Sequence, residues 1–99
     1  MTAIEDRLAA ARERYLASLT QKADRLVAEL ERGDLTELRT LVHRLAGSAA
    51  LHQLDAIAEH ARAAEALCVE PEPSGVASTI TDLVAMLQAA HAEVEHSHG

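Results

Sequence analysis

Aromatic residues are almost absent from this sequence: among its 99 residues there is no Phe or Trp, and Tyr15 is the only Tyr. Aromatic and β-branched side chains favour strands, whereas alanine and leucine, which together supply 35 residues, favour helices. The composition therefore disfavours a β-sheet. A chain of this length can fold alone as one domain, but it is too short to enclose a deep substrate cleft.

Cysteine and long apolar runs are equally scarce. Cys68 is the only cysteine, which excludes an internal disulfide and fits a reducing cytoplasm. No apolar run approaches the ~20 residues that a membrane-spanning helix needs, and the charged, polar start lacks the pattern of a signal peptide. We therefore expect a cytoplasmic protein without a membrane partner.

Positive charge is also in short supply, since 9 Lys and Arg stand against 16 Asp and Glu, which gives a net charge of −7. Residues 1–50 balance, with eight of each sign, whereas residues 51–99 hold one Arg and eight acidic residues. Nucleic-acid binding needs a basic surface, so we expect no nucleic-acid partner. Arg39 and Arg44 flank His43, where they would complement an acidic partner.

Helical periodicity is the dominant pattern that is present. Apolar residues recur at three- and four-residue spacing in four segments, at about residues 2–32, 34–51, 54–69 and 76–94. Outside the second segment the repeats are Leu8, Tyr15, Leu16, Leu19, Ala23, Leu26, Val27 and Leu30; Leu54, Ile57, Ala61, Ala64 and Cys68; and Val76, Ile80, Leu83, Val84, Leu87 and Ala90. Because short connections make consecutive helices antiparallel neighbours, we predict an all-α, antiparallel up-down four-helix bundle that forms a single domain over residues 1–99.

Several local signals set the predicted boundaries. Gly33 is expected to end the first helix, and Asp34-x-x-Glu37 is a capping box that begins the second. Residues 70–75, which contain two prolines, form the linker before the last helix. The first ten residues are expected either to form a separate short helix or to fray, because no strong cap decides between these forms. Residues 95–99 are predicted to be a frayed tail.

The most informative segment is the run from His43 to Ala49, which reads His-Arg-Leu-Ala-Gly-Ser-Ala. Glycine inside a helix costs about 1 kcal/mol relative to alanine, so Gly47, one turn after His43, needs a local reason. At about 100° per residue the apolar stripe lies away from His43, on Leu35, Leu38, Leu41, Val42, Leu45 and Ala49. The face around His43 consists of Thr36, Arg39, Thr40, Ala46, Gly47 and Ala50. All of these except Arg39 are small, which leaves the imidazole open to a partner.

The run His-x-Leu-x-Gly-Ser-Ala, followed about eleven residues beyond the histidine by an amphipathic helix, resembles the histidine phosphotransfer (HPt) domain of bacterial multistep phosphorelays. The resemblance covers roughly residues 8–90. In that family a four-helix bundle presents one exposed histidine, which takes a phosphoryl group from a receiver aspartate and passes it on. The resemblance implies His43 as the phosphoacceptor, Leu45 as an inward-facing leucine and Gly47 as the glycine beside the imidazole.

The chain departs from the family pattern at several positions. The family often has a lysine where this chain has Ala46, and it tends to have glycines and an aromatic residue where this chain has Ala50, His52 and Gln53. With alanine in the lysine's place, Arg39 lies about 40° around the helix from His43 and is expected to be the nearest cation to the phosphoryl group. Arg44, about 100° away, is expected at the rim of the docking surface.

The resemblance also implies the partners and the chemistry. The partners would be receiver domains of a response regulator or a hybrid histidine kinase, and the receiver would supply Mg²⁺. The chain itself is then expected to need no cofactor, to act as a monomeric phosphoryl carrier, and to have no kinase activity of its own. The neighbours of His43 at the docking surface would be Arg39, Thr40, Arg44, Ala46, Gly47 and Ala50.

Two other classes of protein compete with this interpretation. One is a helical interaction module that docks on a receiver and regulates it without carrying phosphate, which the same residues allow. The other is the dimerisation domain of a histidine kinase. It fits less well, because its usual acidic residue after the histidine and its downstream proline are replaced by Arg44 and Ser48-Ala49.

The remaining candidate residues carry weaker signals. A metal-binding cluster could form in the tail, but the tail has no apolar anchor and is better read as a solvated terminus, so no metal site is predicted. Its members are His91, Glu95, His96 and His98. Cys68 is expected in the core, and His52 and His60 are expected to be ordinary boundary and surface residues. Ser48 lies about 140° from His43, too far round the helix to contact the phosphoryl group.

Overall fold

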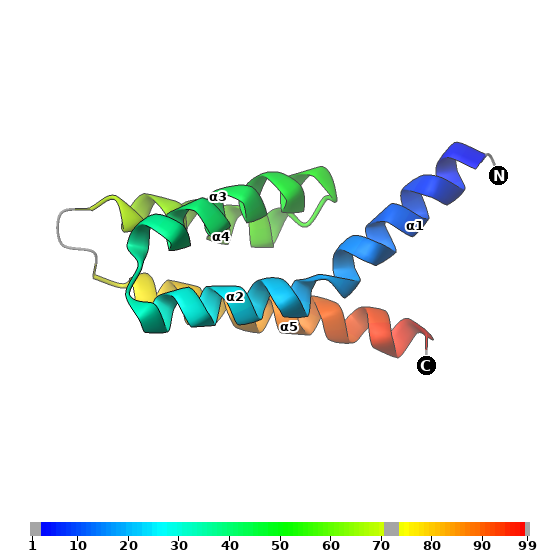
Figure 1. Ribbon diagram of the computed structural model, residues 1–99. Helices are drawn as coiled ribbons and strands as arrows, with labels where there is room; N and C mark the ends of the chain where they lie inside the picture. The colour runs from blue at the N-terminus through cyan, green and yellow to red at the C-terminus, as the bar shows by residue number, and fades with distance from the viewer. Residues whose placement is uncertain (1–2, 71–73, 99) are drawn as a thin grey trace.

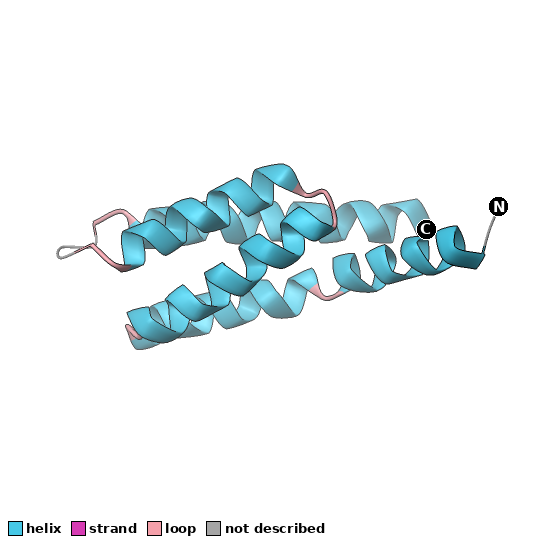
Figure 2. Cartoon of the chain, turned by 90° about the horizontal axis from the view of Figure 1, so that it is seen from above, coloured by secondary structure: helices cyan, strands magenta, loops and turns pink. Residues whose placement is uncertain are grey.

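The computed structural model describes residues 3–70 and 74–98, with side chains described as far as residue 93. This part of the chain contains no strand and forms five helices (Figures 1 and 2). They are α1 (Ala3–Ala17), α2 (Leu19–Arg32), α3 (Leu35–Leu51), α4 (Asp55–Cys68) and α5 (Val76–His98). Helices α2 to α5 run alternately in opposite directions, so the predicted all-α, up-down four-helix bundle is confirmed (Figure 1). None of the described helices is both long and apolar enough to cross a membrane.

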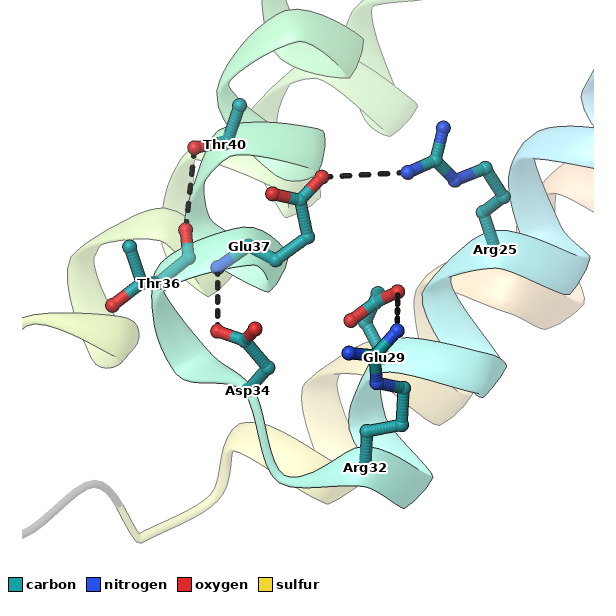
Figure 3. Close-up of polar contacts among 7 residues, drawn as sticks. All are labelled: Arg25, Glu29, Arg32, Asp34, Thr36, Glu37 and Thr40. Carbon is teal, nitrogen blue, oxygen red and sulfur yellow. Dashed lines mark hydrogen bonds and ion pairs between the residues drawn. The ribbon is translucent and has the colours of Figure 1, made fainter.

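The turn between α2 and α3 follows the local capping signals. Gly33 adopts a left-handed conformation with φ of 74°, which a residue without a Cβ does easily. The Asp34 side chain caps α3 by accepting a hydrogen bond from the Glu37 N–H at 3.0 Å (Figure 3). The predicted capping box is only half formed, because the Asp34 N–H donates to the Glu29 carbonyl at 3.3 Å. The Glu37 carboxylate instead accepts from Arg25 of α2 at 3.3 Å.

The N-terminal segment divides at Ser18, later than the first ten residues that the sequence suggested as a separate helix. The Ser18 hydroxyl donates to the Tyr15 carbonyl at 2.6 Å, and such side-chain bonds compete with the helical backbone pattern. Helix α1 then diverges from the bundle, as Figure 1 shows at its blue end. Leu8, which belongs to the predicted apolar repeat, is therefore 65% exposed.

The core lies between α2, α3, α4 and α5 and matches most of the predicted apolar stripes. On α3 the stripe is confirmed: Leu38, Val42, Leu45 and Ala49 are buried, and Leu35 and Leu41 pack partly buried against them. On α4 the core positions are mainly alanines, with Ala58, Ala61 and Ala64 almost completely buried. Small side chains at a helix contact allow the two axes to approach closely, so α3 and α4 form a tight antiparallel hairpin.

The C-terminal helix is longer than the sequence suggested. Helix α5 continues to His98, beyond the predicted end near residue 94, so the prediction of a frayed tail is wrong for residues 95–98. No Pro or Gly interrupts residues 76–98, and nothing local therefore ends the helix earlier. Gly99 lies outside the described residues.

Candidate functional site

His43 lies in the middle of α3, on the side of the helix that faces the edge of α4. Its side chain is 73% exposed, which agrees with its predicted position outside the apolar stripe. The imidazole borders a shallow cavity of about 270 Å³ that both α3 and α4 line. The lining residues are Thr36, Arg39, Thr40, His43, Arg44 and Glu65. The structure thus brings three of the predicted site residues, Arg39, Thr40 and Arg44, around the exposed imidazole.

Glu65 of α4 is the partner of His43 that the sequence analysis missed. The distance between His43 Nδ1 and Glu65 Oε2 is 2.8 Å, within the range of a strong hydrogen bond. A carboxylate can only accept, so Nδ1 carries the proton in this arrangement. In the neutral ring Nε2 then keeps a free lone pair. The contact therefore fixes the orientation and the tautomer of the imidazole.

A weak signal for Glu65 was present in the sequence. It follows Ala61 by four residues and precedes Cys68 by three, so an acidic residue falls along the edge of the apolar repeat of α4. A charged side chain at such an edge position usually has a specific partner. The partner itself could not be read from the sequence, because it is set by the register between α3 and α4.

Two arginines surround the imidazole with positive charge. Arg39 and Arg44 both line the cavity beside His43, and no ion pair engages either of them among the described residues. The Thr40 hydroxyl donates back to the Thr36 carbonyl at 3.2 Å, so it is occupied within its own helix. An anionic group bound at the imidazole would therefore meet two available guanidinium groups.

Cys68 lies near this charged group of residues. Burial raises the pKa of its thiol, the Arg39 charge opposes that rise, and the Glu65 carboxylate adds to it. Cys68 packs against the core as predicted, but it is only partly buried, because it ends α4 next to the exposed Val69 and Glu70.

The glycine and the alanines beside His43 differ in their surroundings. Gly47 is exposed, and a Cβ built there would meet nothing within 4 Å, as expected for a position left open to a partner. Ala46, predicted on the same open face, is only 4% exposed and belongs to the core. Ala50 is half-buried and packs against the core. The prediction of a flat, open face is therefore wrong at Ala46, because α4 covers that side of α3.

A second polar group, centred on Tyr15, joins α1 to the end of α3. The Tyr15 hydroxyl lies 2.6 Å from Ser48 Oγ, and Ser48 in turn donates to the Leu45 carbonyl at 3.2 Å. Ser48 thus faces away from His43, as predicted. The Tyr15 ring stacks on His52 with ring centroids 4.3 Å apart, so His52 is more than an ordinary boundary residue. Burial raises the pKa of Tyr15, and the hydrogen bond to Ser48 partly offsets this.

The other histidines do not join the site. His60 was expected at the surface, but its Nε2 is buried and has no hydrogen-bond partner among the described residues. His91 Nδ1 lies 3.3 Å from the Leu16 carbonyl, near the junction of α1 and α2. The side chains of Glu95, His96 and His98 lie outside the described ones. Within the described side chains, no group of three or more His, Cys, Asp or Glu is arranged to hold a metal ion.

The described residues thus form an antiparallel bundle that presents the exposed His43 on α3. The family model of the Hpt domain matches residues 10–93, and the chain therefore belongs to the Hpt domain family. Domains of this family are phosphocarriers of two-component systems rather than kinases, and they interact with receiver domains. No curated protein and no solved structure matches the chain.

Proposed function

We propose that this chain accepts a phosphoryl group on His43 from the aspartyl phosphate of a receiver domain and passes it to the aspartate of another receiver. One observation carries the proposal: within the family match, the exposed His43 imidazole is held at Nδ1 by Glu65 at 2.8 Å. This contact leaves Nε2 as the nucleophilic atom. The exposed Gly47 leaves space in front of the ring for the partner.

The proposed step is an in-line displacement at phosphorus. The lone pair of His43 Nε2 attacks the phosphorus of the aspartyl phosphate, the bond from phosphorus to the aspartyl oxygen breaks, and the aspartate leaves as a carboxylate. A positive charge develops on the ring while the proton stays on Nδ1, where the Glu65 carboxylate stabilises it. The same steps in reverse transfer the group to the second receiver.

The surroundings of His43 supply charge but no further catalytic group. Arg39 and Arg44 border the same cavity and would contact the phosphoryl oxygens during transfer. The receiver would supply Mg²⁺, and the carrier would need no cofactor of its own. We further infer that the protein works as a monomer, and its free Cys68 supports a cytoplasmic setting.

The test is phosphorylation by a labelled receiver. Incubating the protein with phosphorylated receiver domains should give an acid-labile label that mass spectrometry places on His43. His43→Gln should abolish uptake while leaving helicity and melting temperature nearly unchanged, because an exposed side chain contributes little to packing. His52→Gln is the matched control and should still be labelled. Stable receiver binding without any label on the wild-type protein would instead favour a regulatory module that docks without carrying phosphate.

A further inference from the structure

A second and larger cavity lies between α2 and α3, next to the one that contains His43. Its volume is about 380 Å³, within the range of small-molecule sites in proteins. It is lined by Ser18, Gln21, Lys22, Arg25, Leu26, Leu41, Arg44, Leu45 and Ser48. Leu26 and Leu45 are at most 4% exposed and belong to the core, so the floor of this groove is apolar.

The charge of the groove is opposite to that of the chain. The whole chain has a net charge of −7, yet three of its nine cationic side chains, Lys22, Arg25 and Arg44, line this one cavity. None of the described side chains that line it is acidic. Arg25 is paired with Glu37 at 3.3 Å, so Lys22 and Arg44 are the cations at the rim that a bound anion would meet. An apolar floor beside these two cations is complementary to a molecule that has an apolar body and an anionic end.

The groove is short because contacts between helices cross it near both ends. At one end the ion pair between Arg25 and Glu37 joins α2 to α3 at 3.3 Å (Figure 3). At the other end Tyr15 reaches from α1 to Ser48 of α3 at 2.6 Å. The lining residues run from Ser18 to Leu26 along α2 and its N-cap and from Leu41 to Ser48 along α3, a length of about 10–12 Å on each side. A partner helix would have to extend past these crossing contacts, whereas a small molecule fits between them.

We propose that the groove between α2 and α3 binds a small amphipathic anion, an alkyl or aromatic group that ends in a carboxylate. The apolar part lies on Leu26, Leu41 and Leu45, and the anionic end lies against Lys22 and Arg44. Arg44 also lines the His43 cavity, so the two sites share one guanidinium group.

Octanoate is a suitable probe, and amide chemical shifts of the isotope-labelled, unphosphorylated protein report where it binds. The expected shifts lie at Gln21, Leu41 and Ser48. Acetate has the charge without the chain, and octyltrimethylammonium has the chain with the opposite charge. Both are expected to bind at least about tenfold more weakly than octanoate, because each lacks one of the two matched features. Equal affinity for octanoate and octyltrimethylammonium would overturn the proposal.

Two double variants test the named cations. Lys22→Gln with Arg44→Gln should weaken octanoate binding about tenfold, since two ion pairs at a partly exposed site are lost. Arg12→Gln with Arg62→Gln removes the same charge from exposed positions outside the groove and should change the affinity little. If the two double variants lose the same amount of octanoate affinity, the loss reflects the net charge of the protein, and the proposed site is refuted. Binding of an acidic helical peptide but not of octanoate would likewise refute it and show a protein-docking surface. Phosphoryl transfer is not needed in any arm, so the result is independent of the proposed function.

Discussion

Replacing Glu65 with glutamine separates the charge of this residue from its shape. The amide can still accept a hydrogen bond from His43 Nδ1, but it no longer offsets the positive charge that develops on the ring during phosphoryl transfer. Hydrogen bonds to charged groups contribute about 1.5–3 kcal/mol when shielded. The His43 side chain is 73% exposed, and solvent screening reduces this to about 1 kcal/mol. We therefore expect Glu65→Gln to slow transfer about fivefold.

The assay is single-turnover transfer from a phosphorylated receiver, combined with the nitrogen chemical shifts of the His43 imidazole, which report the tautomer. Glu65→Gln should lower the rate and reduce the share of the ring that is protonated at Nδ1, with an unchanged melting temperature. Glu59→Gln is the matched control, because Glu59 is exposed on the same helix and makes no contact with His43. If both variants have the same rate and the same tautomer population, Glu65 does not position the imidazole.

Three further substitutions test the surroundings of the site. Gly47→Leu should raise the unfolding free energy by up to about 1 kcal/mol while it slows transfer strongly, so unimpaired transfer would mean that the partner approaches from another side. Arg39→Ala should shorten the phosphohistidine lifetime several-fold. Adding Ala46→Lys should not restore the lifetime, because a lysine side chain at this buried position lowers the unfolding free energy by about 1–3 kcal/mol. A restored lifetime would contradict the burial of Ala46. Tyr15→Phe should lower the unfolding free energy by about 0.5–1.5 kcal/mol at neutral pH through loss of the Ser48 contact. Folding raises the pKa of Tyr15, so the contribution of Tyr15 to the unfolding free energy is complete below its ordinary pKa of 10.0 and is lost as the pH rises through the pKa in the folded protein. Chemical denaturation above that pH should show a decline in the unfolding free energy of the wild-type protein that Tyr15→Phe lacks.

Features that depend on local sequence could be predicted before the structure was known. Gly33 and Asp34 define the turn between α2 and α3 through their own backbone and side-chain preferences, and the structure places both as expected. The apolar stripe of α3 depends only on the helical period, and its buried residues were predicted correctly. The exposure of His43 follows from the same period, because it lies outside that stripe.

Features that depend on the packing of one helix against another could not be predicted. A single helical period cannot show which neighbouring helix covers each face, and for this reason Ala46 was expected to be open but is buried under α4. The same limit hid the contact between His43 and Glu65, which lie 22 positions apart. The stacking of Tyr15 on His52 depends on the direction in which α1 leaves the bundle, and that direction has no counterpart in the local sequence.

The hairpin of α3 and α4 gives the site an uneven tolerance to changes in chain length. His43 and Glu65 lie on two helices joined by a turn of only three residues, His52, Gln53 and Leu54. One residue inserted within α4 ahead of Glu65 turns its carboxylate about 100° around the helix axis and away from the imidazole. Extra residues in the linker at 70–75 leave this pair in register, because both of its members lie on the other side of the linker. Insertions in the linker thus preserve the orientation of the imidazole, whereas an insertion within α3 after His43 or within α4 before Glu65 separates the pair.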